Sequence, residues 1–248
     1  MKISIITSVY NNKNTIIDAI ESILNQTYNN IEYIVVDGAS SDGTVDVIQK
    51  YKDNIATFVS ERDKGIYDGL NKGISLATGD VIAFLHSDDL YASNDVIQMI
   101  VDEFQKDKSL DGVYGDLIYT PKGDTSKVLR YWKSREFNVE LLKKGWMPAH
   151  PTFFVKKEVY DKYGSFDLNF KISGDYDFML RVLSSAIKVK YIPKVFYKMR
   201  MGGESNKSLK NIIQKSREDL LALKKNNVGG FFTLLIKNFS KIGQFIRK

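Results

Sequence analysis

Short apolar runs alternate with amphipathic segments over the first hundred residues of the chain. The runs are rich in β-branched residues, which is typical of strands buried in a parallel sheet. They cover Lys2–Ser8, Ile31–Asp37, Ile55–Ser60 and Val81–Leu85. Between them, the spacing predicts helices over Thr15–Gln26, Asp42–Tyr51, Ile66–Ala77 and Ser93–Gln105. Strict alternation of strand and helix predicts an α/β fold with a parallel sheet and right-handed crossovers.

The pattern loosens after residue 110. Short strands are predicted at Gly112–Tyr119, Thr152–Val155, Lys188–Tyr191 and Val195–Met199, and a helix over Tyr176–Ser185. From Lys207 the chain turns helical and basic, with a break at Asn226–Gly230. We therefore expect a core of residues 1–205, divided at residue 110, and a helical extension of residues 206–248.

Composition narrows the class of protein. Of the 248 residues, 43% are hydrophobic and 12% aromatic, which is typical of a folded domain. The absence of cysteine excludes a disulfide scaffold, a thiolate zinc site and a cysteine nucleophile. No apolar run reaches the roughly 18 residues of a membrane span, and the first ten residues do not resemble a signal peptide. We therefore expect a soluble cytoplasmic protein.

The net charge of +6 is unevenly distributed along the chain. The first hundred residues hold 14 acidic and seven basic side chains, whereas residues 205–248 hold ten basic and two acidic ones. The acidic part contains the predicted parallel sheet, and the basic part is the predicted extension. No nucleic-acid-binding motif accompanies the basic residues, so we expect no nucleic acid partner.

Polar residues follow the predicted strands at their carboxyl ends, where open α/β sheets bind ligands. The first strand leads into Ser8–Asn12, the second into Asp37–Ser40 and the fourth into His86–Asp89. Asp88 and Asp89 offer the oxygen ligands that suit Mg²⁺ or Mn²⁺, with a helix cap or a solvated turn as the alternative. The chain lacks both a P-loop and a G-x-G-x-x-G turn, which disfavours a P-loop nucleotidase and a dinucleotide site.

Four sequence blocks carry a specific resemblance. ISIITSVYNN, ESILNQTY, IEYIVVDGASSDGT and NKGISLATGDVIAFLHSDD follow one another across residues 3–89. In this order and spacing they resemble the family 2 glycosyltransferases, which are nucleotide-sugar-dependent enzymes. The stretches HPTFF, SGDYDFMLR and MRMGGES are similar to the bacterial branch that builds polysaccharide and lipid-linked glycans. The resemblance covers residues 3–205 of the chain.

The resemblance implies the GT-A fold, with a mostly parallel mixed sheet flanked by helices. It further implies that residues 1–110 form the nucleotide-binding half and residues 111–205 the acceptor-binding half of one catalytic domain. The C-terminal segment lies outside it.

The resemblance also assigns nucleotide-binding roles. Ser8, Tyr10 and Asp37 match positions that hold the nucleoside, with Tyr10 against the base and Asp37 accepting the imide N–H of the base. Asn11 is grouped with them at the end of the first strand. The alternatives are a strand-end hydroxyl, a core tyrosine and a turn-forming aspartate. Lys64, after the third strand, is expected to touch phosphate or nucleotide, with a solvated lysine as the alternative.

A metal motif is implied at Ser87-Asp88-Asp89, where the family pattern begins with Asp instead of Ser87. Asp89 is expected to bind Mn²⁺ or Mg²⁺ directly, and Asp88 to contact the metal or the ribose. Such a metal would neutralise the diphosphate that leaves the sugar.

Asp175 matches the position of the family's general base, which usually follows a Glu where this chain has Gly174. Residues i and i+2 of a helix do not face each other, so only one of Asp175 and Asp177 can point at the substrate. Asp175 is alternatively a helix cap. Asp177, His150 and Arg200 are weaker candidates for contacts with acceptor or phosphate, with packed or solvated side chains as the alternative.

The end of the chain, residues 231–248, has an amphipathic pattern. One stripe holds Phe232, Leu235, Phe239, Ile242 and Ile246, and another holds Lys237, Lys241, Gln244 and Lys248. An apolar face flanked by cations predicts an interfacial helix in peripheral contact with a membrane. A helix packed on the catalytic domain or on another subunit is the alternative.

We therefore expect a metal-dependent inverting glycosyltransferase. It would move a sugar from a nucleoside diphosphate sugar, with UDP as the commonest nucleotide, to the hydroxyl of a glycan or lipid-linked acceptor. Its place would be the cytoplasm, at the inner face of the membrane. One alternative is a sugar nucleotidyltransferase, which would need a Gly-rich basic loop after the first strand. Another is an inactive, membrane-associated binding relative. The sequence leaves an oligomer open.

Overall fold

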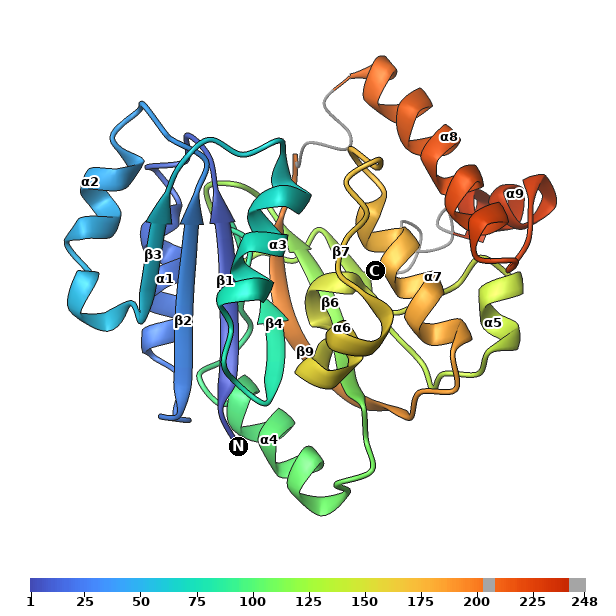
Figure 1. Ribbon diagram of the computed structural model, residues 1–248, viewed down its shortest axis with the longest axis horizontal. Coiled ribbons are helices and arrows are strands. Elements are labelled where there is room, and N and C mark those ends of the chain that lie inside the picture. The colour runs from blue at the N-terminus through green and yellow to red at the C-terminus, as the bar shows by residue number, and fades with distance from the viewer. Residues whose placement is uncertain (203–207, 241–248) are drawn as a thin grey trace.

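The computed structural model describes residues 1–202 and 208–240. In these residues one nine-stranded mixed sheet has the order β3-β2-β1-β4-β8-β6-β9-β5, with β7 paired to β6. The strands are β1 Ile3–Val9, β2 Ile31–Asp37, β3 Thr57–Ser60, β4 Val81–Phe84, β5 Leu90–Tyr91, β6 Gly112–Thr120, β7 Arg130–Trp132, β8 Phe154–Lys156 and β9 Val189–Arg200. The helices are α1 Ile16–Leu24, α2 Thr44–Gln49, α3 Ile66–Leu76, α4 Val96–Lys106, α5 Glu140–Lys143, α6 Lys157–Tyr163, α7 Gly174–Ser184, α8 Leu209–Lys225 and α9 Phe231–Ser240 (Figure 1).

The four strands β1 to β4 are parallel, as the hydrophobic pattern predicted. β1 lies between β2 and β4, and β3 pairs with the outer side of β2. Val9 is opposite Asp37, and Asp37 is opposite Ser60. The carboxyl ends of β1, β2 and β3 therefore meet at one edge of the sheet. Their apolar side chains alternate between two cores, which explains why the runs are continuous in the sequence.

The second half of the sheet is mixed. β8 is antiparallel to β4 and β6, whereas β9 is parallel to β6. The pattern predicted two short strands here, but the structure has the single strand β9. Tyr114 pairs with Tyr191 and Asp116 with Val195, so residues 192–194 form an irregularity inside a continuous strand. A second shift follows, because Leu117 pairs with Tyr197, and such extra residues break the alternation of side chains without ending the strand, so periodicity alone did not reveal β9 as one strand.

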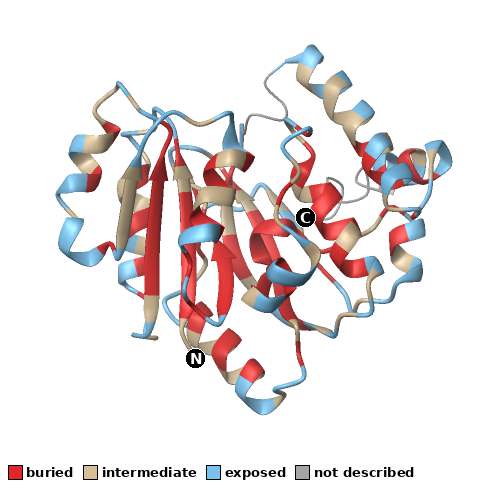
Figure 2. Ribbon diagram, viewed as in Figure 1, coloured by how far each residue is buried: buried red, intermediate tan, exposed pale blue. Residues whose placement is uncertain are grey.

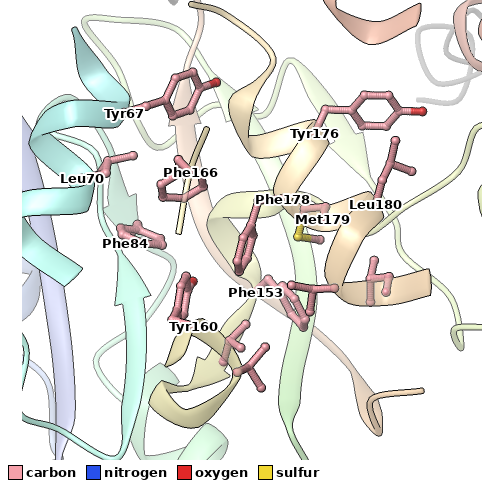
Figure 3. Close-up of a cluster of buried hydrophobic side chains, with 14 of the residues drawn as sticks. Tyr67, Leu70, Phe84, Phe153, Tyr160, Phe166, Tyr176, Phe178, Met179 and Leu180 are labelled. Carbon is pink, nitrogen blue, oxygen red and sulfur yellow. The ribbon is translucent and has the colours of Figure 1, made fainter. Parts of the chain in front are cut away.

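Helix α7 and its neighbours pack on one face of the sheet. Buried residues concentrate in the central strands and on the inner side of α7 (Figure 2). The core there includes Phe84, Tyr160, Phe166 and Phe178, and the rings of Tyr160 and Phe178 stack with centroids 4.8 Å apart (Figure 3). Ala222, Leu223 and Leu234 belong to the same core. Helices α8 and α9 are thus packed on α7.

Helix α9 has a packed side and an exposed side. Thr233, Leu234 and Lys237 are buried, whereas Phe232, Ile236 and Phe239 are exposed. Lys237, which the sequence pattern placed on the basic stripe, is buried, and its ammonium lies 2.9 Å from the buried Asp219 carboxylate.

The predicted stripes also include Ile242, Ile246, Lys241, Gln244 and Lys248, which lie outside the described residues. Within residues 1–202 and 208–240, no helix has the length and apolar character needed to cross a membrane.

Candidate active site

Asp37 ends β2 at the carboxyl edge of the sheet and is fully buried. Its Oδ2 accepts hydrogen bonds from the Ser40 N–H at 3.0 Å and from the Ser60 hydroxyl at 2.7 Å. Its Oδ1 is buried and has no hydrogen-bond partner within the described residues. A buried carboxylate oxygen without a donor is costly, so this atom is suited to a donor supplied by a ligand.

Asn11 joins the loops that follow β1 and β2. Its N–H donates to the Ser40 hydroxyl at 2.8 Å, and its side-chain carbonyl accepts from the Ser41 N–H at 2.8 Å. Asn11 and Ala39 both have positive φ, at 47° and 62°, which marks two tight reversals of the chain. Asn11 therefore shapes the loop around Asp37.

Tyr10 lies next to this loop and is 64% exposed. A Cβ atom at Gly38 would lie 3.4 Å from the Tyr10 ring and 2.7 Å from Asp63 Oδ2. Glycine at position 38 thus lets the Asp63 carboxylate and the Tyr10 ring approach the backbone of this loop closely. The alternative of a core tyrosine is therefore not found, and Asp63, which the sequence pattern did not single out, lies against Gly38.

Ser8 and Lys64 differ in their surroundings. The Ser8 hydroxyl faces Gly69 in the first turns of α3, where a Cβ atom would overlap it. Lys64 is exposed, and its backbone N–H donates to Asp68 at 2.9 Å. Ser8 is therefore part of the walls of this edge, whereas the Lys64 side chain extends toward solvent.

The loop after β4 holds two adjacent carboxylates in different environments. Asp89 is buried, and its Oδ1 accepts the Arg200 N–H at 2.8 Å. Burial, and then the negative charge of Asp88, raises the pKa of the Asp89 carboxyl well above its usual range. Asp88 is less buried. Asp89 thus faces β9, and Asp88 is the carboxylate that remains more accessible.

Arg200 ends β9 and is buried under this loop. Its guanidinium donates to the Asp88 carbonyl at 2.6 Å and to the Lys122 carbonyl at 3.1 Å, and it forms an ion pair with Asp18. Arg200 was a candidate for a contact with acceptor or phosphate, with a packed or solvated side chain as the alternative. Instead its three contacts fix the backbone that carries Asp88.

Asp88 and Asp89 fit a divalent cation only in part. The described residues contain no group of three or more acidic or histidine side chains that could hold a metal ion. The negative charge of Asp88 nevertheless disfavours the charged form of Asp89, and a bound cation would offset this repulsion. Mg²⁺ and Mn²⁺ commonly take one or two protein carboxylates and complete their shell with phosphate oxygens and water. The pair therefore fits a metal that arrives with a diphosphate.

Asp175 lies in the first turn of α7. Its Oδ1 accepts the Tyr176 N–H at 2.8 Å and lies 3.1 Å from the Tyr67 hydroxyl, which is also 2.7 Å from the Ile172 carbonyl. Burial, and then the charge of Asp175, raises the pKa of the Tyr67 phenol well above its usual range. Tyr67 belongs to α3, so this contact joins α7 to the helix that follows β3.

Two histidines lie close enough to Asp175 to feel its charge. Burial lowers the pKa of His150 to about 4, and it lowers the pKa of His86 although the charges of Asp88 and Asp175 oppose it. Both imidazoles are therefore neutral at pH 7. His150 Nε2 is buried and lacks a hydrogen-bond partner within the described residues.

Asp177 points away from Asp175. It is fully buried, with Arg181 at 2.6 Å, Lys225 at 3.0 Å and the Asn226 amide at 2.9 Å. These contacts tie α7 to α8. Because they engage both oxygens of the Asp177 carboxylate, this side chain is not available to an acceptor. As helical geometry required, only one of the two carboxylates faces the site.

The structure thus brings together at the carboxyl edge the predicted residues Ser8, Tyr10, Asn11, Asp37, Asp88, His150 and Asp175. Sequence reasoning missed Tyr67 and Asp63, and it gave no role to His86 although it placed His86 at this edge. His86 and Asp63 lie beside predicted residues in the sequence, which is a signal that could have found them. Tyr67 is 108 residues from Asp175, and no local pattern connects them.

The fold is GT-A, as two solved structures indicate. TarS residues 1–349 from S. aureus, in complex with UDP-GlcNAc, matches with a TM-score of 0.71 and 18% identity over 90% of this chain and 66% of that one. The mannosyltransferase PcManGT from Pyrobaculum calidifontis, in complex with GDP-Man and Mn²⁺, matches with a TM-score of 0.70 and 20% identity over 96% and 69%. The chain covers only 40% of the longer TarS chain.

The Glycosyl transferase family 2 model matches residues 4–164, so the chain belongs to glycosyltransferase family 2. It is 30% identical over 219 residues to the Escherichia coli UDP-Glc:alpha-D-GlcNAc-diphosphoundecaprenol beta-1,3-glucosyltransferase WfaP, covering 86% of this chain and 84% of WfaP. It is 28% identical over 192 residues to a PGL/p-HBAD biosynthesis glycosyltransferase of Mycobacterium bovis, covering 75% and 72%. The resemblance seen in the four blocks is confirmed.

Proposed function

We propose that the chain is a metal-assisted inverting glycosyltransferase that uses a UDP-sugar and a glycan or lipid-linked acceptor. The observation that carries this proposal is the Tyr67–Asp175 contact, which sets a carboxylate of α7 beside the nucleotide edge. WfaP, whose name specifies a UDP-glucose donor and a diphosphoundecaprenol acceptor, supports the classes of donor and acceptor.

The nucleoside would bind at Asp37. Its unpaired Oδ1 accepts the imide N–H of the base, and the exposed Tyr10 ring covers the base. The diphosphate would extend toward Asp88, which holds Mn²⁺ or Mg²⁺. Asp89 fixes the metal loop to β9 through the Arg200 N–H, so we assign the more direct contact to Asp88. When bound, such a metal neutralises charge on the leaving diphosphate.

Asp175 would act as the general base. It takes the proton of the acceptor hydroxyl while that oxygen forms a bond to the anomeric carbon of the sugar. The bond from that carbon to the phosphate oxygen breaks, and its electron pair leaves with the nucleoside diphosphate. Attack from the side opposite the leaving group inverts the anomeric carbon. Because the pKa values of His86 and His150 are lowered, neither histidine is expected to carry a positive charge beside Asp175. His150 Nε2 is suited to a hydrogen bond with a hydroxyl of the sugar or the acceptor.

Asp175→Asn tests this assignment. The amide keeps the shape of the carboxylate but cannot take a proton, so we expect sugar transfer to fall by about 10²–10⁴-fold. UDP affinity, measured by calorimetry, should stay within twofold, and Asp161→Asn serves as an exposed control. The donor is chosen from UDP-glucose, UDP-GlcNAc and GDP-mannose, each with and without Mn²⁺. Undiminished transfer by Asp175→Asn would overturn the role of the base.

The exposed side of α9 is the proposed membrane contact. Phe232, Ile236 and Phe239 are exposed on α9. The C-terminal segment that contains α9, residues 205–248, holds ten basic side chains. Lys237, the basic residue within Phe231–Ser240, is paired with Asp219 on the opposite side, so the exposed apolar side chains carry this contact. The basic composition of residues 205–248 favours an anionic bilayer, where a lipid-linked acceptor would lie. Phe232→Ser with Phe239→Ser should reduce flotation with phosphatidylglycerol vesicles, whereas Val128→Ser, another exposed apolar position, should not. Equal flotation of both variants would contradict this contact.

A further inference from the structure

The segment that leads into α7 is held by one carboxylate from α8. Glu218 accepts the N–H groups of Lys171 at 3.1 Å, Ile172 at 2.8 Å and Ser173 at 2.9 Å. Three consecutive N–H groups that converge on one carboxylate define the path of the chain just before Asp175. The contact spans 45 residues of sequence between Ser173 and Glu218.

Glu218 is built to remain ionised. Burial alone would raise its pKa, but the N–H groups of Ile172 and Ser173 and the Gln214 side chain at 3.0 Å outweigh burial and lower it. Within the described residues, no lysine or arginine forms an ion pair with Glu218. Its charge is stabilised by backbone N–H groups at the N-terminus of α7, where charge-assisted bonds and the helix dipole both favour an anion.

The opposite side of the same segment is held by α3. The Tyr67 hydroxyl lies 2.7 Å from the Ile172 carbonyl and 3.1 Å from Asp175 Oδ1. Ile172 therefore donates its N–H to Glu218 and presents its carbonyl to Tyr67. Two side chains from distant helices clamp the residue three positions before the carboxylate of Asp175.

Helix α8 is itself fixed, so Glu218 has a rigid support. Lys225 lies 3.0 Å from the buried Asp177 of α7. Asp219, next to Glu218, lies 2.9 Å from Lys237 of α9, whose ammonium is 3.1 Å from the centroid of the Tyr176 ring. These contacts tie α8 to α7 and to α9 on the C-terminal side of Glu218.

We propose that Glu218 is a positioning residue for the general base, and that α8 is thus a working part of the catalytic site. This inference rests on the proposed role of Asp175. Glu218 acts by setting the backbone at residues 171–173 and, through it, the direction of the Asp175 carboxylate. A displacement of a catalytic carboxylate by about 1 Å can lower the rate about 10²-fold, and this sets the size of the effect that we expect.

Glu218→Ala and Glu218→Gln test the proposal. Alanine removes the acceptor, so we expect kcat for sugar transfer to fall about 10- to 100-fold with the KM of the donor unchanged. Glutamine keeps one carbonyl oxygen for these N–H groups and should recover most of the lost kcat. Glu158→Ala, a largely exposed glutamate on α6, is the control. The kcat values are referred to the fraction of protein that binds UDP by calorimetry, which removes the effect of misfolded protein.

The outcomes separate this inference from the proposed function. Wild-type kcat in Glu218→Ala, or a rise in donor KM without a loss of kcat, overturns the positioning role. Undiminished transfer by Asp175→Asn, measured in parallel, overturns the base assignment instead. If Glu218→Ala does not fold, Glu218→Asp takes its place, because its carboxylate is one methylene too short to reach the three N–H groups: a lowered kcat supports the proposal and a wild-type kcat overturns it. Amide hydrogen exchange at Ile172 and Ser173 gives a readout that needs no activity, and unchanged protection in the folded variant also contradicts the proposal.

Discussion

Gly174 lies directly against the ring of Tyr67. A Cβ atom at position 174 would lie 2.8 Å from Tyr67 Cε2 and 2.9 Å from Cδ2, closer than such atoms approach. Family 2 patterns usually carry a glutamate at this position, next to the general base. In this chain the Tyr67 ring fills that space and its hydroxyl reaches Asp175. The glycine is therefore the partner of the tyrosine, and the departure from the family pattern does not disturb Asp175.

Gly174→Ala should destabilise the protein through this contact. Alanine in a helix is ordinarily more favourable than glycine by about 1 kcal/mol, but overpacking against the Tyr67 ring should cost about 1–3 kcal/mol. Urea denaturation of Gly174→Ala, Tyr67→Ala and the double variant measures the coupling. In the Tyr67→Ala background the methyl group should no longer be unfavourable. Equal effects of Gly174→Ala in both backgrounds would refute the steric explanation.

Asp177→Ala should act on stability rather than on the acceptor. It removes the partner of Arg181 and Lys225 from a fully buried position, but both cations are partly exposed and Lys225 keeps Asp167 at 2.7 Å. We therefore expect a loss of about 1.5–3 kcal/mol, the range for a hydrogen bond to a charged group. Chemical denaturation should show this loss, while the KM for acceptor in the folded protein stays unchanged. Asp161→Ala is the exposed control. A raised acceptor KM at normal stability would instead restore Asp177 as an acceptor contact.

The secondary structure of the first hundred residues could be predicted because each strand and helix shows its own pattern in a short, continuous stretch of sequence. Continuous apolar runs between amphipathic segments fixed β1 to β4 and α1 to α4 to within a few residues, and the order of the strands placed Asp37 and Asp88 at one edge. β9 was split because residues 192–194 interrupt its alternation. The short elements β5, β7, α5 and α6 carry too few residues for a period to be visible.

Residues of the candidate site could be predicted only where they belong to contiguous sequence motifs. Asp37, Asp88 and Asp175 lie in such motifs. Tyr67 and Glu218 act on Asp175 from helices 108 and 43 residues away in sequence, and their side chains carry no signal of it. Lys237 shows the same limit, since helical spacing placed it correctly on the side opposite Phe232 but could not reveal that Asp219 covers that side.

Glu32 should make folding stability sensitive to acid. It lies on β2, where burial tends to raise its pKa, but Lys2, Ser4 and Thr78 outweigh burial and lower the pKa to about 2. A group whose pKa is lowered in the folded state contributes stability above its unfolded pKa and loses that contribution as pH falls through its folded pKa. The Glu32 contribution should therefore be complete above about pH 4.5 and disappear toward pH 2.

Urea midpoints of the wild type and of Glu32→Gln, measured from pH 7 to pH 2, test this dependence. The variant should be less stable at pH 7 and should converge on the wild type at pH 2. Glu158→Gln, which is largely exposed, should follow the wild type throughout. Parallel curves for the wild type and Glu32→Gln would show that Glu32 is not the source of the acid sensitivity.

Arg200→Lys should weaken the metal-dependent part of nucleotide binding. The guanidinium reaches the Asp88 carbonyl, the Lys122 carbonyl and Asp18 at once, and a lysine ammonium cannot make these three contacts in one plane. The loop that presents the Asp88 carboxylate should therefore lose its fixed position. UDP titrations with and without Mn²⁺ separate this effect, since the base is proposed to bind at the loop around Asp37, apart from the metal. We expect the gain in affinity due to Mn²⁺ to shrink about tenfold and the metal-free affinity to remain.

Arg62→Lys, on the exposed loop before α3, is the matched control. A loss of the metal-free affinity as well would mean that Arg200 supports the whole edge of the sheet rather than the loop after β4.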